Sequence, residues 1–325
     1  MKKTMAWLGA FLMVFSMAGC GGSSEVVKPS SVSAQTQEAA GSGASDEGGE
    51  SKADEGSAGA TDGQGTEAQQ DTEASAASGK ETIEETVLLD EGGLKVTAKS
   101  LDKNALMGPE IKLLIDNESG KDLTVQTRNV SINGYMVDTM MSADVVSGKK
   151  ANDSLTFMRS DLQACGIDTI ADMEFSFHVF ETSNWHDYLN SDPVVLKTSA
   201  AEGYNYVYDD SGDVAYTDDN LKIVIKGLSN DSLLGPGVVV YIANTGSQDV
   251  TVQAKDVSIN GFMIDPIFSA DVCVGKHAVD SITFMSSNLK DNGIDKIEKV
   301  ELSFHVFTTN GWDTVVDTDP VTITF

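Results

Sequence analysis

The stretch VSINGYMVD, residues 130–138, returns almost letter for letter as VSINGFMID at residues 257–265. Each copy places Asn-Gly between alternating apolar residues. This is the strongest short-range signal for a two-residue β-hairpin, because both central residues of a type I′ turn need positive φ. A slip of one residue would turn the apolar set to water, so the turn sets the register of the surrounding sheet. In the first copy, four side chains are expected to share one face: Val130, Ile132, Tyr135 and Val137.

The repetition extends far beyond the hairpin. Residues 94–198 align with residues 221–325 without a gap, at a constant offset of 127, and 49 of the 105 positions are identical. The chain therefore carries a tandem duplication, with repeats at 83–198 and 210–325 that each have the usual size of a domain with its own core. Residues 199–209 connect them. Their alternating tyrosines are expected to pack against one repeat and limit the angle between the two: Tyr204, Tyr206 and Tyr208.

Within each repeat the apolar residues recur with a period of two, as β-strands require. Residues 111–115 and 238–242 are interpreted as continuously apolar strands in the middle of a sandwich. Short strands separated by turn signals predict an all-β sandwich. Further strands of the first repeat are expected at 94–99, 123–126, 143–146, 155–158 and 174–180.

One segment in each repeat is predicted to be helical. Ser160 is expected to cap a short helix that ends at Gly166, and Ser287 and Gly293 take these positions in the second repeat.

The N-terminal residues predict export. Met1–Ser16 has two lysines followed by an apolar run that is too short to span a bilayer, as in a secretory signal. The residues that follow, Met-Ala-Gly and Cys20, resemble the lipobox of bacterial lipoproteins. This resemblance implies a signal peptide at 1–19, a diacylglyceryl group on Cys20, and an extracytoplasmic protein anchored to the bacterial cell membrane. The alternative is an ordinary signal with a chance cysteine.

Residues 20–82 are predicted to be a lipid-anchored, disordered linker. The segment is rich in Gly, Ser, Ala and acidic residues, and its only aliphatic residues beyond alanine are three valines. It cannot bury enough apolar surface to offset its ordering entropy. A flexible tether of about sixty residues reaches roughly 40 Å, so the expectation is a stalk that lifts the folded part off the membrane.

The charge balance excludes one class of partner. The formal net charge of −28 leaves no basic patch to displace counterions from nucleic acid. An anionic lipid surface would repel the body of the protein, which leaves the lipid as its membrane connection. Cys165 and Cys273 do not occupy matching positions in the two repeats, so they are interpreted as isolated buried thiols.

The two repeats are similar to immunoglobulin-like domains of unknown function in surface lipoproteins of Gram-positive bacteria. The residues that carry the resemblance are the apolar strand followed by an Asn-containing turn, the SINGxMxD hairpin, and the Gly-Lys turn before a strand ending in Phe. The resemblance implies two tandem immunoglobulin-like β-sandwiches. It implies no reaction, no cofactor and no catalytic residue.

His178 and His305, in the matching strands EFSFHVF and ELSFHVF, are the residues that would first suggest catalysis, but no catalytic residue is predicted and they are kept as candidates for ligand binding. Residues two apart on a strand lie about 6.6 Å apart, which is beyond the reach that Ser176 and His178 would need as nucleophile and base. A histidine on a solvated sheet face or at an interface is the favoured interpretation, and the chain is expected not to be an enzyme.

Trp185 and Trp312 lie in polar, turn-like segments before the last strand of each repeat. Two interpretations stay open: a plug that closes the end of the sandwich core, which is favoured, or a contact for a sugar or protein. Met136 and Met263, on the outward face of the hairpins, are candidates for a soft binding patch.

No metal site is predicted. Five aspartates recur at matching positions, but turn aspartates commonly serve the backbone and no calcium-loop spacing of the EF-hand type is present. Calcium binding stays an open alternative. The recurring pairs are Asp138 and Asp265, Asp144 and Asp271, Asp153 and Asp280, Asp168 and Asp295, and Asp192 and Asp319.

These features predict a non-enzymatic binding or adhesion module for an extracellular protein or glycan. The alternative is a structural or accessory envelope lipoprotein that spaces or assembles other components.

Overall fold

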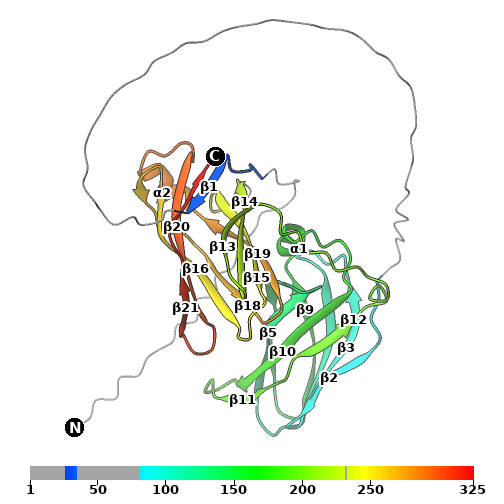
Figure 1. Ribbon diagram of the computed structural model, residues 1–325. Coiled ribbons are helices and arrows are strands. Elements are labelled where there is room, and N and C mark those ends of the chain that lie inside the picture. Colours follow the sequence, from blue (N-terminus) through cyan, green and yellow to red (C-terminus); the bar gives the residue numbers. More distant parts are fainter. Residues whose placement is uncertain (1–25, 35–80, 231–232) are drawn as a thin grey trace, which may run out of the picture. The chain divides into compact units, whose positions relative to one another are not determined.

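The computed structural model describes residues 26–34, 81–230 and 233–325, and it is nearly all β (Figure 1). Within these ranges the helices are limited to two short ones, α1 (Arg159–Ala164) and α2 (Ser286–Asp291). No helix in this part of the chain is long and apolar enough to cross a membrane. The predicted all-β class is confirmed, and the strand pairings of the described residues are antiparallel except for one.

The first repeat consists of two sheets that pack face to face. Phe157 from one sheet meets Phe175 and Phe177 from the other in a core of fully buried side chains. One sheet has the order β2 (Thr86–Glu91), β3 (Leu94–Asp102), β4 (Glu110–Asn117), β9 (Lys149–Phe157) and β7 (Thr139–Met140). The other contains β11 (Asp187–Asn190), β10 (Asp172–Glu181), β5 (Leu123–Ile132), β6 (Tyr135–Met136), β8 (Ser142–Val145) and β12 (Val194–Lys197).

The second repeat has the same arrangement and a separate core, in which Phe284 and Phe304 are fully buried. One sheet is formed by β13 (Asp213–Thr217), β14 (Leu221–Ser229), β15 (Gly237–Asn244) and β19 (His277–Thr283). The other contains β22 (Val321–Thr324), β20 (Lys299–Thr308), β16 (Val250–Ile259), β17 (Phe262–Met263), β18 (Ser269–Val272) and β21 (Thr314–Asp317).

Both Asn-Gly hairpins have the predicted backbone. Asn133 and Gly134 have φ of 51° and 85°, and Asn260 and Gly261 have φ of 51° and 89°, as a type I′ turn requires. Ile132 pairs with Tyr135, so the register is also as predicted.

A buried asparagine explains the Asn-containing turn that follows the central strand. The Nδ2 group of Asn117 donates to the carbonyl oxygens of Lys121, at 2.8 Å, and Val145, at 2.7 Å. Asn244 makes the matching bonds to Gln248 and Val272. The side chain thereby ties the strand end to the turn after it and to a neighbouring strand.

The two sheets that carry Tyr135 and His277 join through one parallel pairing of these residues, which makes a single ten-stranded sheet. A third buried cluster lies at this junction, formed by Tyr135 of the first repeat and Val224, Tyr241 and Ala243 of the second. The described residues of both repeats accordingly belong to one compact unit.

Two local predictions need correction. The helix N-caps are Met158 and Met285 rather than serines, and neither makes a side-chain capping bond. Ser160 lies inside the first turn, where its hydroxyl donates to Asp161. The strand at 111–115 is not buried on both faces, because Lys112 alternates with buried neighbours and points to solvent. Gly166 does end α1, with φ of 67°.

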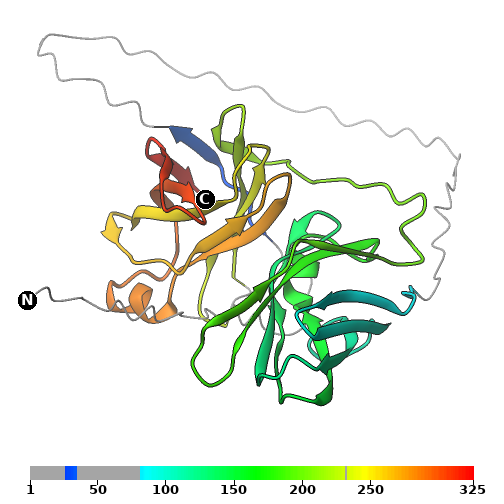
Figure 2. The ribbon, with the colours of Figure 1, turned by 90° about the horizontal axis from the view of Figure 1, so that it is seen from below.

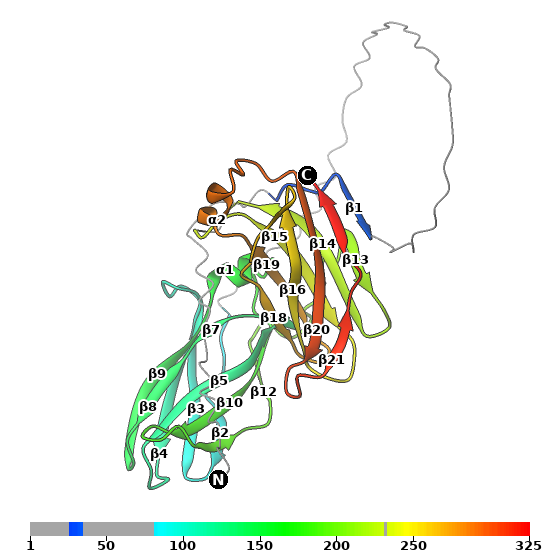
Figure 3. The ribbon, with the colours of Figure 1, turned by 90° about the vertical axis from the view of Figure 1, so that its left-hand side faces the viewer.

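Residues 26–34 are an exception to the predicted disorder of the linker. They contain β1 (Ser31–Ala34), which pairs antiparallel with the edge of β22, the C-terminal strand (Figures 1, 2 and 3). The three valines of the linker all lie in this segment, and Val32 packs against the core of the second repeat. The segment is ordered because its backbone pairs with an existing sheet edge and Val32 packs against an existing core.

Candidate binding surface

Trp185 lies in the loop that joins β10 to β11, and Trp312 lies in the matching loop between β20 and β21. Both have left-handed backbones, with φ of 61° and 60°. Their amides donate to the carbonyl oxygens of Glu181 and Thr308, at 2.9 Å in each loop. A bulky residue at positive φ costs on the order of 1 kcal/mol or more, so the tertiary fold must hold this conformation in place.

Neither tryptophan plugs a core. The exposed fraction is 74% for Trp185 and 76% for Trp312. The core-plug interpretation favoured by the sequence is therefore wrong. A short hairpin loop that projects beyond the sheet carries each indole out to solvent instead.

Each indole lies flat on a buried phenylalanine. The rings of Trp185 and Phe180 have centroids 5.1 Å apart and planes inclined by 16°. The rings of Trp312 and Phe307 lie 5.3 Å apart at 12°. Because Phe180 and Phe307 are only 4% and 5% exposed, each indole is supported from below and presents its other face to solvent.

A histidine lies beside each stack. The ring of His178 is 5.4 Å from that of Phe180, and the ring of His305 is 5.3 Å from that of Phe307. His178 is only 7% exposed, so the expected solvated face is wrong for this residue, whereas His305 is half-buried. Phe180 lies beside the His178 ring, and Asn190 and Asp187 of the neighbouring β11 lie against its two nitrogens.

The polar partners of the histidines differ between the repeats. His178 Nδ1 lies 2.7 Å from Asn190 Oδ1, and its Nε2 lies 3.7 Å from Asp187. His305 Nδ1 lies 2.8 Å from Asp317 Oδ1. The hydrogen bond from His305, and then Lys255 at 3.3 Å, hold the pKa of Asp317 below its usual value. The first stack thus has a neutral amide where the second has a carboxylate.

We name these groups the aromatic stacks: His178, Phe180 and Trp185 in the first repeat, and His305, Phe307 and Trp312 in the second. Residues two apart on a strand share a face, so alternation brings His178 and Phe180 together, but it does not bring Trp185 to them. The signal that could have done so is an outward Phe at the end of a strand with a Trp in the hairpin loop that follows it.

The two hairpin methionines have different surroundings. Met136 is half-buried and packs against the core cluster of the second repeat, so its predicted outward position is wrong. Met263 is 68% exposed. The two methionines therefore do not form equivalent binding patches.

The connector tyrosines contact both repeats. Tyr204 accepts a hydrogen bond from Asn133 at 3.0 Å, and the hydroxyl of Tyr206 donates to Asp172 in the first repeat. The ring of Tyr208 stacks on His277 of the second repeat, with centroids 3.7 Å apart. The aromatic connector is thus part of the junction.

Three carboxyl groups gather near the junction. Burial, and then the charge of Asp138, raise the pKa of Asp161 to about 6. Burial, and then Asp138 and Asp161, raise the pKa of Asp280 to about 7. Burial also raises the pKa of Asp138, whose amide donates to Asp161 Oδ2 at 2.7 Å.

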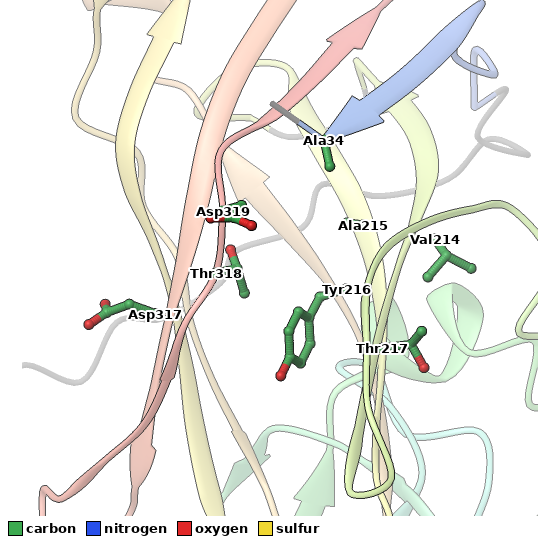
Figure 4. Close-up of a pocket in the computed structure, with 8 residues that line it drawn as sticks. All are labelled: Ala34, Val214, Ala215, Tyr216, Thr217, Asp317, Thr318 and Asp319. Carbon is green, nitrogen blue, oxygen red and sulfur yellow. The ribbon is translucent and has the colours of Figure 1, made fainter. Parts of the chain in front are cut away.

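A surface pocket of about 400 Å³ lies on the second repeat (Figure 4). Tyr216 and Thr318 come from opposite walls, and Ala34 at the end of β1 borders it. Asp317 also lines the pocket, and its carboxylate lies 2.8 Å from His305 Nδ1 of the second repeat (Figure 4). The pocket therefore lies next to the strand that carries Asp317.

The cysteines and the recurring aspartates form no metal or disulfide site in the part of the chain that the structure describes. Cys20 lies outside that part. Cys165 and Cys273 are unpaired and half-buried. In the described ranges, no three His, Cys, Asp or Glu side chains are grouped so that they could hold a metal ion.

The comparisons with known proteins add no identity. No family model matches the chain, and no curated protein is significantly similar to it.

Proposed function

We propose that this chain is a non-enzymatic, lipid-anchored extracytoplasmic protein whose two immunoglobulin-like domains bind glycans through the aromatic stacks. The observation that carries the proposal is an indole in a costly backbone conformation, exposed and supported from below, which occurs at the same position in both repeats. Backbone strain that a fold maintains twice, at an exposed aromatic residue, favours a binding role.

The chemistry of the surface favours a sugar. The apolar C–H face of a pyranose ring can lie on a flat indole, which removes apolar area from water at about 25 cal/mol per Å². The hydroxyl groups at the ring edge then need polar partners. Asp187 offers an exposed carboxylate beside the first stack, and Asp317 and Lys255 offer charged groups beside the second.

Duplication strengthens weak sites. Two linked sites can exceed the affinity of either one by a factor of about 10²–10⁴ when both engage one multivalent ligand. A polysaccharide or glycosylated surface presents many copies of one sugar, which suits a protein with two similar stacks. The net charge of −28 favours neutral or cationic glycans over strongly acidic ones.

A glycan array followed by calorimetry tests the proposal. We expect Trp185→Ala and Trp312→Ala each to weaken binding of a multivalent glycan at least about tenfold, and the double variant to abolish it. Phe262→Ala is the matched control, because Phe262 is an exposed aromatic residue outside the stacks.

Two outcomes would contradict glycan binding: no bound glycan on a broad array, or binding that the double variant leaves unchanged. Retention of an envelope protein by the full chain, lost with the same double variant, would support a protein ligand instead. Retention that survives the double variant would support the alternative role, a structural or accessory lipoprotein that assembles other components.

A further inference from the structure

The segment at residues 26–34 is bound to the second repeat at two places. Along β1, Ser31, Val32, Ser33 and Ala34 pair in register with the last strand, from Thr324 back to Val321. Upstream, Val27 exchanges two backbone hydrogen bonds of 2.8 Å with Leu228 of β14. Because β22 and β14 belong to different sheets, the segment closes the seam between the two sheets.

The second repeat has a residue adapted to this segment. Gly227 has φ of 147°, and a Cβ atom there would collide with the carbonyl oxygen of Val27 and the side chain of Val26. The matching residue of the first repeat is Ser100, an exposed position on β3. A glycine therefore stands where the segment approaches and a serine stands at the matching position of the first repeat.

In the part of the chain that the structure describes, the matching edge of the first repeat carries no such strand. Among the described residues, β12 pairs with β10 alone, and Val195 on it is 52% exposed. The segment thus pairs with β22 of the second repeat and not with β12, the equivalent strand of the first repeat. It also covers an edge that would otherwise be open to pairing with another chain.

We propose that this segment holds the second repeat next to the membrane anchor, and that residues 35–80 connect the two repeats instead of serving as a stalk. The proposal rests on the proposed lipid at Cys20. Only residues 21–25 separate Cys20 from Val26, and a chain of that length spans at most about 20 Å. The remaining linker then runs from β1 to the first repeat, so its length does not set the distance of the second repeat from the membrane. Closing a loop of this size is tolerable, since doubling its length costs only about 0.6 kcal/mol more.

Cysteine pairing in the full chain tests the docking independently of the lipid. In a chain with Cys165 and Cys273 changed to alanine and a protease site inserted near Gly56, we introduce Ser33→Cys with Thr322→Cys, which are direct partners. After mild oxidation and cleavage, the two fragments should stay joined on a non-reducing gel. The matched control is Ser33→Cys with Val195→Cys, which places the second cysteine on the other repeat and should leave the fragments separate. Joining in the control, no joining in either chain, or a disulfide between two molecules would overturn the docking.

Energy transfer tests the consequence at the membrane. A donor dye on Asp219→Cys in the second repeat and acceptors in the lipid headgroups report their separation. With the native segment, doubling residues 35–80 should leave the transfer efficiency unchanged. Val32→Asp should undock the segment, lower the transfer and make it sensitive to linker length.

Transfer that falls on linker doubling with the native segment would overturn the proposal. A protein that never reaches the membrane fraction would refute the lipid anchor, and the anchoring role with it, while the cysteine result would still decide the docking.

Discussion

Tyr135 and Phe262 occupy the same position in the two hairpins, yet Tyr135 is 4% exposed and Phe262 is 48% exposed. Tyr135 packs with Tyr241 in the junction cluster, and its ring meets Tyr208 edge-on at 5.3 Å. Phe262 lies outside all three buried clusters of the described residues. One motif therefore has two roles, and paired substitutions in the two hairpins can separate turn chemistry from packing at the junction.

The first prediction concerns the turn glycines. Gly134→Ala and Gly261→Ala both place a side chain at positive φ, which costs about 1–2 kcal/mol. The new Cβ at 134 would also lie 2.5 Å from the Tyr208 hydroxyl, whereas nothing lies within 4 Å at 261. Gly134→Ala should therefore lower the melting temperature of the full chain more than Gly261→Ala. Equal losses would show that Tyr208 does not pack against this turn.

The second prediction concerns the hairpin methionines. Met136→Ser removes apolar contact with the core of the second repeat and should destabilise the chain by about 1–3 kcal/mol in urea unfolding. Met263→Ser is the control and should stay within about 0.5 kcal/mol, because Met263 is exposed. A neutral Met136→Ser would show that the junction contributes little to stability.

The third prediction concerns the buried asparagines. Asn117→Ala leaves the carbonyl oxygens of Lys121 and Val145 without the Nδ2 donor, and Asn244→Ala does the same in the second repeat. Each substitution should cost about 1–3 kcal/mol in chemical unfolding. The exposed Asn104→Ala serves as the control. A decrease in unfolding free energy below about 0.5 kcal/mol would mean that water takes the place of the Nδ2 group as the donor to these carbonyl oxygens.

The fourth prediction concerns pH. Burial raises the folded-state pKa of Asp280 to about 7, above its usual 3.8. Between these values the folded state binds more protons than the unfolded state, so stability falls as pH rises from about 4 to about 7. Asp280→Asn should remove much of this fall and stabilise the chain at pH 8 by about 1–3 kcal/mol, with a smaller gain at pH 4.

Asp153→Asn is the control for this measurement. Asp153 holds the matching position and accepts the same backbone hydrogen bond from the following serine, at 2.7 Å, as Asp280 does at 2.6 Å. Because Asp280 is still present in this variant, the fall in stability between pH 4 and pH 7 should remain. Identical pH profiles for Asp280→Asn and the unmodified chain would refute the assignment.

The fifth prediction concerns the anchor. Cys20→Ser removes the proposed acceptor of the lipid, so the protein should leave the membrane fraction or keep its signal peptide. Detergent partitioning and intact mass measure both effects. Unchanged partitioning would refute lipid attachment at Cys20.

Much of the fold was accessible from local pattern. The Asn-Gly turns, the buried face shared by Val130 and Ile132, and the helix end at Gly166 all follow from side-chain alternation and backbone preference over a few residues. The ungapped duplication then extended each local conclusion to the second repeat. The prediction of serine N-caps was wrong because each helix begins two residues earlier than these caps imply, so that Ser160 and Ser287 lie inside the first turn.

The strand pattern, the hairpin register and the all-β class could therefore be predicted from the amino-acid sequence. Which surfaces are covered could not: Tyr135 is buried and Phe262 is exposed, His178 is buried, and β1 pairs with the edge of β22. Alternation along a strand reports which way a side chain points, whereas its burial depends on what lies opposite. Here the opposing residues are far away in sequence, as when Ser31 pairs with Thr324, and no local pattern encodes that contact.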